Sequence, residues 1–401
     1  MHHSRRRLLD FRLRLLRVLL VLALLTERSA EAGLPHAEPE AVGLDSQRLQ
    51  RIDEVVDEGL AQKKMPGCVV CVGRHGKIAF LKAYGQKQLQ PSELPMTTDT
   101  LFDMASITKP MATATSVMLL EERGQLRLSD KVATLIPEFA INDKDAITIQ
   151  DLLIHQSGLL ADNPIADYAD GPETAMRRIF ELKLLNPTGS KFVYSDVNFI
   201  LLGEIVRRVS GKNVHEFSQE KIFRPLGMSA TGYLPNEKLR ARTAPTEQRD
   251  GQWMQGDVHD PRAFKLGGVA GHAGLFSTAE DVAIFAQMML GQGESNGVRI
   301  LSAETVATMT RSYRVSSGVR GLGWDKRTAY SSNRGEAFSE AAFGHGGFTG
   351  TVLWIDPEFD LFFIFLSNRV HPNGKGLVNP LAGRIATAIA AAIQEDRSPK
   401  K

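Results

Sequence analysis

Residues 351–366, TVLWIDPEFDLFFIFL, place two apolar runs on either side of a short acidic segment. Both runs are rich in β-branched and aromatic residues, and the DPEFD between them is typical of a turn. We therefore expect a β-hairpin near the C-terminal end of the chain. A second hairpin is expected from Cys68 to Tyr84, where two apolar stretches meet at RHGK, residues 74–77.

Between the two hairpins the chain has mostly helical patterns, with capping residues and apolar positions at helical spacing. Strands at both ends around a helical middle predict an α+β fold, in which an antiparallel β-sheet is flanked by helices and carries an inserted, mainly helical lobe at about 104–255. The expected helices cover about 46–60, 106–123, 148–155, 171–182, 196–209, 214–223, 277–290 and 379–394.

The composition is that of a globular protein. Of 401 residues, 43% are hydrophobic and 23% are charged, which excludes a disordered chain. The 48 basic and 46 acidic residues give a net charge of +2, which argues against nucleic acid as a partner. We expect a linker at 33–41, one domain at 42–395 and a polar tail at 396–401.

Residues 1–32 have the three parts of a secretory signal. An Arg-rich start precedes the apolar run Val18–Leu25, and the small residues of Ala30-Glu31-Ala32 follow. We expect cleavage near Ala32-Gly33 and an exported protein, periplasmic or secreted, without a membrane span in its mature form. Export by the twin-arginine route and an uncleaved amphipathic anchor are the alternatives.

Cys68 and Cys71 form a C-x-x-C within an apolar run that predicts a buried strand. Residues three apart on a strand point to opposite faces, with Cα atoms roughly 10 Å apart. A disulfide needs a shorter distance than this. The two residues are therefore predicted to be thiols in the core.

The sequence Ser106-Ile107-Thr108-Lys109 is an S-x-x-K at the start of an expected helix. Side chains at i and i+3 share a helical face, so the lysine amine can reach the serine hydroxyl. A desolvated lysine near the positive end of a helix can have a lowered pKa and act as a base. Free N–H groups at the helix start can stabilise an oxyanion.

Two further motifs follow in order, Tyr194-Ser195-Asp196 and His345-Gly346-Gly347. With S-x-x-K they resemble the S-x-x-K, Y-x-N and K-T-G motifs of the serine β-lactamase and penicillin-binding protein superfamily. The tyrosine resembles the class C β-lactamase side, which includes D-amino-acid peptidases and esterases. The segments 152–159 and 271–278 are also similar to that superfamily, and the resemblance runs from about 40 to 395. Residues 344–351 resemble a branch that includes esterases and a muramoyl-peptide amidase.

The resemblance implies a role for each matching residue. Ser106 would attack a carbonyl and become acylated, and Lys109 and Tyr194 would share the proton transfers. The oxyanion hole would be the backbone N–H groups of Ser106 and Phe348. Tyr194 is a base only if Lys109 lowers its pKa. The residues expected to contact substrate are Asp196, His345, Gly346 and Gly347, and neither a metal nor another cofactor is expected.

Two residues depart from the superfamily pattern. Asp196 stands where an asparagine is usual, and it adds negative charge beside the substrate. His345 stands where β-lactamases have lysine, and it is mostly uncharged at neutral pH. Both changes weaken a site for the β-lactam carboxylate. We therefore expect hydrolysis of an ester or amide, simple or derived from peptidoglycan, ahead of efficient β-lactam hydrolysis.

The residues leave other functions open. A β-lactamase or D-amino-acid carboxypeptidase would share the chemistry, and a non-catalytic protein that binds peptidoglycan would share the fold. Asp257, His259, Asp260 and His272 suggest a metal site, although their spacing matches no tight ligand pattern and polar loop residues are the preferred interpretation. His155 is expected to be a structural histidine bonded to backbone.

Overall fold

The computed structural model describes residues 33–394. The predicted signal sequence and polar tail lie outside these residues. Residues 33–41, predicted as a linker, include a bridge from His36 to Ile78 and the start of a short 3-10 helix, Pro39–Val42.

The main sheet has nine strands in the order β11-β12-β13-β14-β15-β16-β1-β2-β3, and each neighbouring pair is antiparallel. Both expected hairpins are confirmed, as β1–β2 and β15–β16. The strand from the end of the chain, β16, pairs directly with β1, so Cys68 lies opposite Ser367. The strands are β1 (Gly67–Arg74), β2 (Lys77–Gln88), β3 (Leu94–Pro95), β11 (Tyr313–Val315), β12 (Gly318–Arg320), β13 (Asp325–Arg327), β14 (Phe343–Gly347), β15 (Thr351–Asp356) and β16 (Leu361–Ser367).

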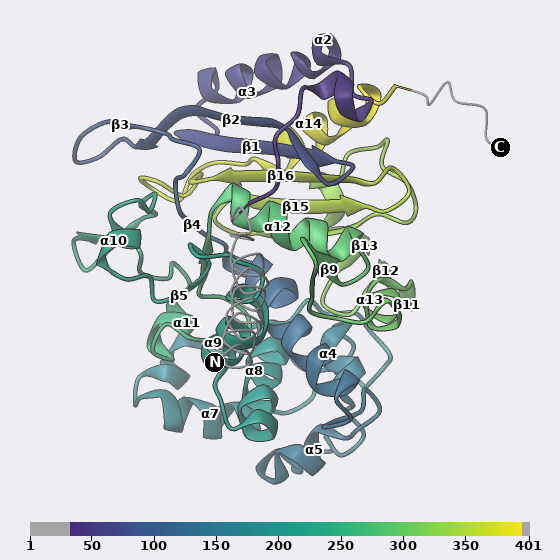
Figure 1. Cartoon of the computed structure of the whole chain (residues 1–401). Coiled ribbons are helices and arrows are strands. Elements are labelled where there is room, and N and C mark those ends of the chain that lie inside the picture. The colour runs from purple at the N-terminus through teal and green to yellow at the C-terminus, as the bar shows by residue number, and fades with distance from the viewer. Residues whose placement is uncertain (1–32, 395–401) are drawn as a thin grey trace, which may run out of the picture. The chain divides into compact units, whose positions relative to one another are not determined.

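Helices cover both faces of this sheet (Figure 1). On one face α3 and α14 pack together, and alternate residues of the sheet such as Val70 and Phe363 face them. On the other face α12 lies against β16 and β1, and the helical region shares one hydrophobic core with α12. The central strands are buried on both sides, which explains why their sequences are continuous apolar runs rather than alternating ones.

Most predicted helices are present with ends that differ by a few residues. The segment 46–60 is divided into α2 and α3, and the segment 214–223 ends as a π-helix from Gln219 to Phe223. The α-helices are α2 (Ser46–Leu49), α3 (Arg51–Ala61), α4 (Thr115–Glu122), α5 (Val132–Leu135), α6 (Ile149–Leu153), α7 (Pro172–Phe180), α8 (Asp196–Ser210), α9 (Val214–Ser218), α10 (Glu237–Arg240), α11 (Pro261–Lys265), α12 (Ala279–Leu290), α13 (Ala303–Thr310) and α14 (Asn379–Ala391).

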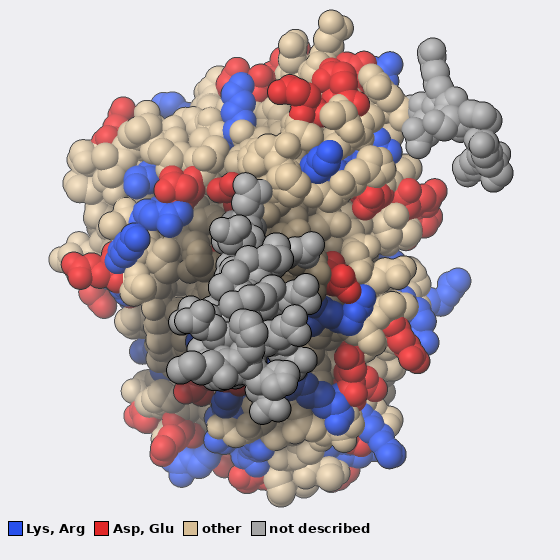
Figure 2. All heavy atoms as spheres, viewed as in Figure 1, with Lys and Arg blue, Asp and Glu red and all other residues tan. Residues whose placement is uncertain are grey.

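The expected α+β architecture is confirmed. Cys68 and Cys71 are free thiols, both buried in β1, as predicted. Basic and acidic side chains are interspersed over the face in Figure 2, as a net charge near zero suggests. Between residues 33 and 394, no helix is both long enough and apolar enough to cross a bilayer.

Candidate active site

Ser106 lies in a 3-10 turn, Ala105–Ile107, and Lys109 begins a π-helix, Lys109–Ala114, that leads into α4. The prediction of one regular helix over 106–123 is therefore wrong in its first half. The predicted contact still forms, because Lys109 Nζ lies 2.9 Å from Ser106 Oγ. A wider turn still places the two side chains on the same side of the chain.

The residue before the nucleophile holds a strained conformation. Ala105 has φ of 45°, a region that a residue with a Cβ rarely adopts. Its N–H donates to Asp103 Oδ1 at 2.8 Å, and Asp103 Oδ2 also accepts the N–H of His259 at 2.7 Å. The buried carboxylate of Asp103 thus stabilises the turn that presents Ser106.

Lys109 is fully buried and has three acceptors. Its Nζ donates to Ser106 Oγ and to the carbonyl of His272 at 3.1 Å, and it lies 2.6 Å from Asp196 Oδ1. Burial by itself lowers the pKa of Lys109, but Asp196 and Tyr194 raise it by more. The expectation of a lysine with a lowered pKa is therefore wrong: three acceptors, one of them the Asp196 carboxylate, hold it as an ammonium ion.

Tyr194 directly precedes the N-cap of α8, Ser195. Its ring packs on that of His155, with centroids 4.6 Å apart, and Lys109 Nζ lies 5.0 Å from the ring centre. Burial raises the pKa of Tyr194, and although Lys109 and a bond to Ser106 lower it, the net shift is upward. His155 Nδ1 accepts the N–H of Ser195 at 3.0 Å, the structural role that we predicted for it.

Asp196, the first residue of α8, lines the same cavity as Ser106 and pairs with Lys109. The negative charge expected beside the substrate is thus balanced by the lysine. A role for Asp196 in contacting substrate stays a prediction, whereas its contact with Lys109 was missed by the sequence analysis. The two residues are far apart in sequence, and no spacing pattern connects them.

The strand β14 contains His345, Gly346 and Gly347 and passes close to the serine turn. A Cβ on Gly347 would lie 2.6 Å from the carbonyl oxygen of Met104, so only glycine allows this approach. Phe348 follows the strand, and its side chain is 61% exposed. Ser106 and Phe348 thus meet at one cavity, where their backbone N–H groups are expected to form the oxyanion hole.

His345 is an uncharged imidazole. Its Nδ1 donates to the carbonyl of Gly346 at 2.8 Å, and its pKa lies well below the usual value because of burial and because Arg320 and Lys109 are near. This tautomer leaves Nε2 as an acceptor, and that atom has no hydrogen-bond partner within residues 33–394. The absence of charge agrees with the expectation for this position.

The cavity has a volume of about 550 Å³. All the predicted site residues except Lys109 line it, and Lys109 lies directly beneath Ser106 and Asp196. It also contains Arg320, the last residue of β12, which the sequence analysis did not single out. A lone arginine before a glycine has no distinctive signal in sequence.

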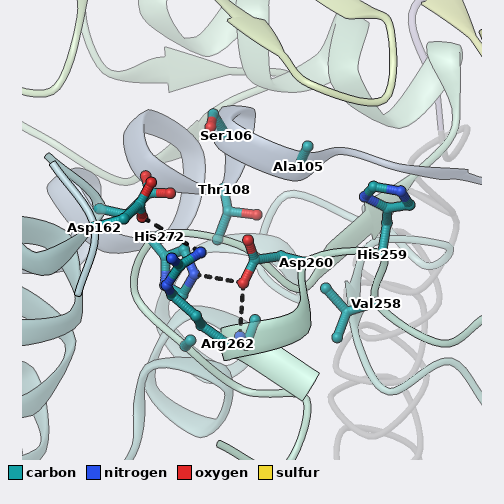
Figure 3. A network of polar contacts seen from close by, with 12 residues as sticks. Ala105, Ser106, Thr108, Asp162, Val258, His259, Asp260, Arg262 and His272 are labelled. Atoms are coloured by element: carbon teal, nitrogen blue, oxygen red, sulfur yellow. Dashed lines mark hydrogen bonds and ion pairs between the residues drawn. The ribbon is translucent and has the colours of Figure 1, made fainter. Parts of the chain in front are cut away.

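The residues considered for a metal site separate into different pairs. Asp260 accepts from His272 Nε2 at 2.9 Å, as Figure 3 shows, and it also accepts the N–H of Ala263 at 2.7 Å. Asp257 pairs with Arg240, whereas His259 Nε2 lies 2.6 Å from Glu247. The ligand atoms of Asp196, Asp260 and His272 do lie within 4.8 Å of one another. Because Lys109 and His272 already pair with these carboxylates, we assign no metal to them.

Comparisons with known proteins identify the class. The sequence pattern of the β-lactamase family matches residues 52–388, and the chain therefore belongs to that family. It is a serine hydrolase of the β-lactamase and penicillin-binding protein superfamily. The expected superfamily is confirmed.

Individual relatives refine the comparison. An N-acetylmuramyl-L-alanine amidase of Bacillus subtilis is 34% identical, over 83% of this chain and 83% of its own. A protein of Escherichia coli whose name proposes a D-alanyl-D-alanine carboxypeptidase is 32% identical, over 84% of this chain and 86% of its own. A penicillin-binding protein homologue from Caulobacter crescentus has a similar structure, with a TM-score of 0.71 at 22% identity over 87% of this chain and 99% of its own. This last likeness shows the fold alone.

Proposed function

We propose that the protein hydrolyses an amide or ester of a peptidoglycan-derived fragment through an acyl-enzyme on Ser106. The observation that carries this proposal is the 2.9 Å contact of Ser106 Oγ with a buried lysine at the wall of an open cavity. The names of the amidase and carboxypeptidase relatives support the substrate class.

In this mechanism Ser106 Oγ attacks the substrate carbonyl, and the backbone N–H groups of Ser106 and Phe348 stabilise the oxyanion. Because Lys109 is an ammonium ion and Tyr194 a neutral phenol at rest, the reactive form is the one in which this pair has lost one proton to solvent. In that form the Tyr194–Lys109 pair accepts the proton of Ser106, and Tyr194 then delivers a proton to the leaving group. The Asp196 carboxylate, 2.6 Å from Lys109 Nζ, raises the pKa of the lysine and so raises the pH at which this reactive form appears. Water then attacks the acyl-enzyme, and the same groups act in reverse.

D-Amino-acid carboxypeptidase activity is the second candidate. It uses the same acyl-enzyme, and the name of the Escherichia coli relative favours it. A non-catalytic binding protein is disfavoured, because a binder has no need for a serine, lysine and tyrosine in mutual contact.

The test is the intact mass of the full chain after incubation with a fluorophosphonate. We expect one adduct on the wild type and none on Ser106→Ala. Ser190→Ala, which removes an exposed hydroxyl bonded only to Pro187, should still take up the label. No adduct on well-folded wild-type protein would refute an activated serine.

We also propose that residues 1–32 direct export and are removed after Ala32, on the strength of their Arg-rich start and apolar run. N-terminal sequencing of the protein recovered outside the cytoplasm should give Gly33 as the first residue. Recovery of the intact N-terminus there would favour an anchor instead.

A further inference from the structure

Tyr194 lies in a segment without regular secondary structure, residues 191–195, directly before α8. Ser106 and Lys109 instead belong to a 3-10 turn and a π-helix, whose own hydrogen bonds fix the backbone. A buried segment that lacks such bonds needs other partners, because unpaired backbone groups are costly away from water. The position of the Tyr194 phenol therefore depends on the residues that accept these bonds.

His155 provides a bond on each side of Tyr194. Its carbonyl accepts the N–H of Val193 at 3.0 Å, and its Nδ1 accepts the N–H of Ser195 at 3.0 Å. One residue thus holds the backbone directly before and directly after the tyrosine. The imidazole also packs on the phenol ring, with centroids 4.6 Å apart. The backbone and the ring of Tyr194 are therefore both in contact with His155.

His155 is itself held in place by its surroundings. It is 1% exposed, and its ring contacts those of Phe192 and Phe199, with centroids 5.9 Å and 5.2 Å away. Its φ of 60° is uncommon for residues other than glycine, and such a conformation persists only where the surrounding structure enforces it. Tyr330, which also packs on Tyr194, is 54% exposed. His155 is thus the buried and more rigid support of the two.

The imidazole of His155 is neutral. Burial, together with the nearby charges of Arg320 and Lys109, holds its pKa well below the usual value for histidine. Nδ1 can accept the N–H of Ser195 only in the neutral form that carries its proton on Nε2. A change of rate in a His155 variant would therefore report the loss of a contact rather than the loss of a titrating group.

We propose that His155 is a positioning residue, which holds the Tyr194 hydroxyl where it can protonate the leaving group. The inference rests on the proposed function and adds a residue to its proton transfer. Without the Nδ1 acceptor, the N–H of Ser195 loses its partner and the backbone at Tyr194 can move. A misplacement of about 1 Å can lower a rate by about 10²-fold. The loss should be largest for a leaving group that needs the proton of Tyr194.

The test compares two esters with one acyl group, a para-nitrophenyl ester and a benzyl ester. Nitrophenolate is a weak base that leaves without a proton, whereas the alkoxide of benzyl alcohol needs one. In His155→Phe, which keeps a ring but has no acceptor for Ser195, kcat/KM should fall at least about tenfold more for the benzyl ester. His155→Asn should restore the wild-type ratio of the two esters, because its side-chain oxygen can replace Nδ1 and Asn tolerates a positive φ.

His371→Phe is the matched control. His371 is 2% exposed, and its Nε2 likewise accepts a backbone N–H, that of Leu89 in the loop after β2, at 3.0 Å. Its replacement should destabilise the fold by leaving a buried N–H unpaired, but it should keep the ratio of the two esters. A change of this ratio as large as that in His155→Phe would show a general effect of destabilisation and would overturn the proposal.

His155→Gly covers the case in which His155→Phe does not fold, because glycine readily adopts a φ of 60°. It also lacks the acceptor and should show the same additional loss for the benzyl ester. An unchanged ratio in either variant, or a His155→Asn protein that loses as much as they do, would overturn the proposal. Failure of the proposed function is distinct: the wild type would then hydrolyse neither ester, and Ser106 would take up no fluorophosphonate.

Discussion

Asp196→Asn tests the electrostatic state of the site with almost no change in side-chain size. In the wild type the Asp196 carboxylate raises the pKa of both Lys109 and Tyr194. The groups that must accept the proton of Ser106 therefore lose their own protons only as the pH rises. Removing the carboxylate lowers both pKa values, so the ascending limb of kcat/KM against pH should move to lower pH.

The size of the shift follows from the contact. Two opposite charges about 4 Å apart attract by about 4 kcal/mol at an effective dielectric constant of about 20, which corresponds to about 3 pKa units. The Asn oxygen can still face Lys109, and Asp196 is 19% exposed and so partly screened by solvent. We therefore expect the limb to shift by about 1–3 pH units.

The assay is hydrolysis of one ester from about pH 5 to about pH 10, with kcat/KM fitted at each pH. Asp162→Asn is the matched control: Asp162 lines the same cavity but pairs with Arg262, at 3.7 Å, rather than with Lys109. In Asp162→Asn the ascending limb of kcat/KM should stay within about half a pH unit of the wild type, because Asp162 does not contact Lys109 directly. An Asp196→Asn profile that coincides with the wild type would refute the assignment of Asp196 as the group that sets these pKa values.

Two further predictions concern the strand beside the serine and a buried carboxyl. Gly347→Ala would place a Cβ 2.1 Å from Thr351 Oγ1 and displace the strand that leads to Phe348. We expect kcat to fall by about 10²–10³-fold, as for loss of an oxyanion-hole donor. An unchanged kcat would contradict the assignment of the Phe348 N–H to the oxyanion hole. Burial raises the pKa of Asp281 from 3.8 to about 6. Asp281 thus binds a proton more tightly in the folded protein than in the unfolded chain. The stability that this proton contributes is lost as the pH rises through about 6. Relative to Asp281→Asn, the wild type should lose up to about 3 kcal/mol of unfolding free energy between about pH 4 and about pH 7. Thermal melts at each pH measure this loss. If the unfolding free energies of the two proteins run parallel across this pH range, Asp281 makes no such contribution.

The central part of the fold was predictable because it depends on local patterns. Continuous apolar runs identify β1, β15 and β16, since strands buried on both faces need no polar alternation. The strands β11–β14 lack such runs. In β14 the sequence FGHGG has almost no strand preference, and it is held in place by pairing with β15. His345-Gly346-Gly347 was accordingly expected before a strand rather than within one.

The residues of the candidate site that belong to the three motifs were predictable from the sequence. Ser106, Lys109 and Tyr194 meet as expected, because S-x-x-K is a local contact and the superfamily resemblance connects it to the tyrosine. The charge state was not predictable. It depends on Asp196 lying 2.6 Å from Lys109, a contact between side chains separated by most of the helical region. The place of Arg320 at the cavity is likewise set by the fold, because it lies at the end of the short strand β12.

The pairing of β16 with β1 has a consequence for how the chain folds. Cys68 and Ser367 are neighbours across the sheet, so one of its central contacts joins residues almost 300 positions apart. At about 5–20 residues per second, a ribosome needs roughly 15–60 s to make the chain between them. Throughout that time the apolar hairpin β1–β2 has no partner on its β16 edge. Topologies with such distant pairings fold slowly, so the protein completes its sheet only after synthesis is almost finished, and a chaperone that covers this hairpin during synthesis would limit aggregation.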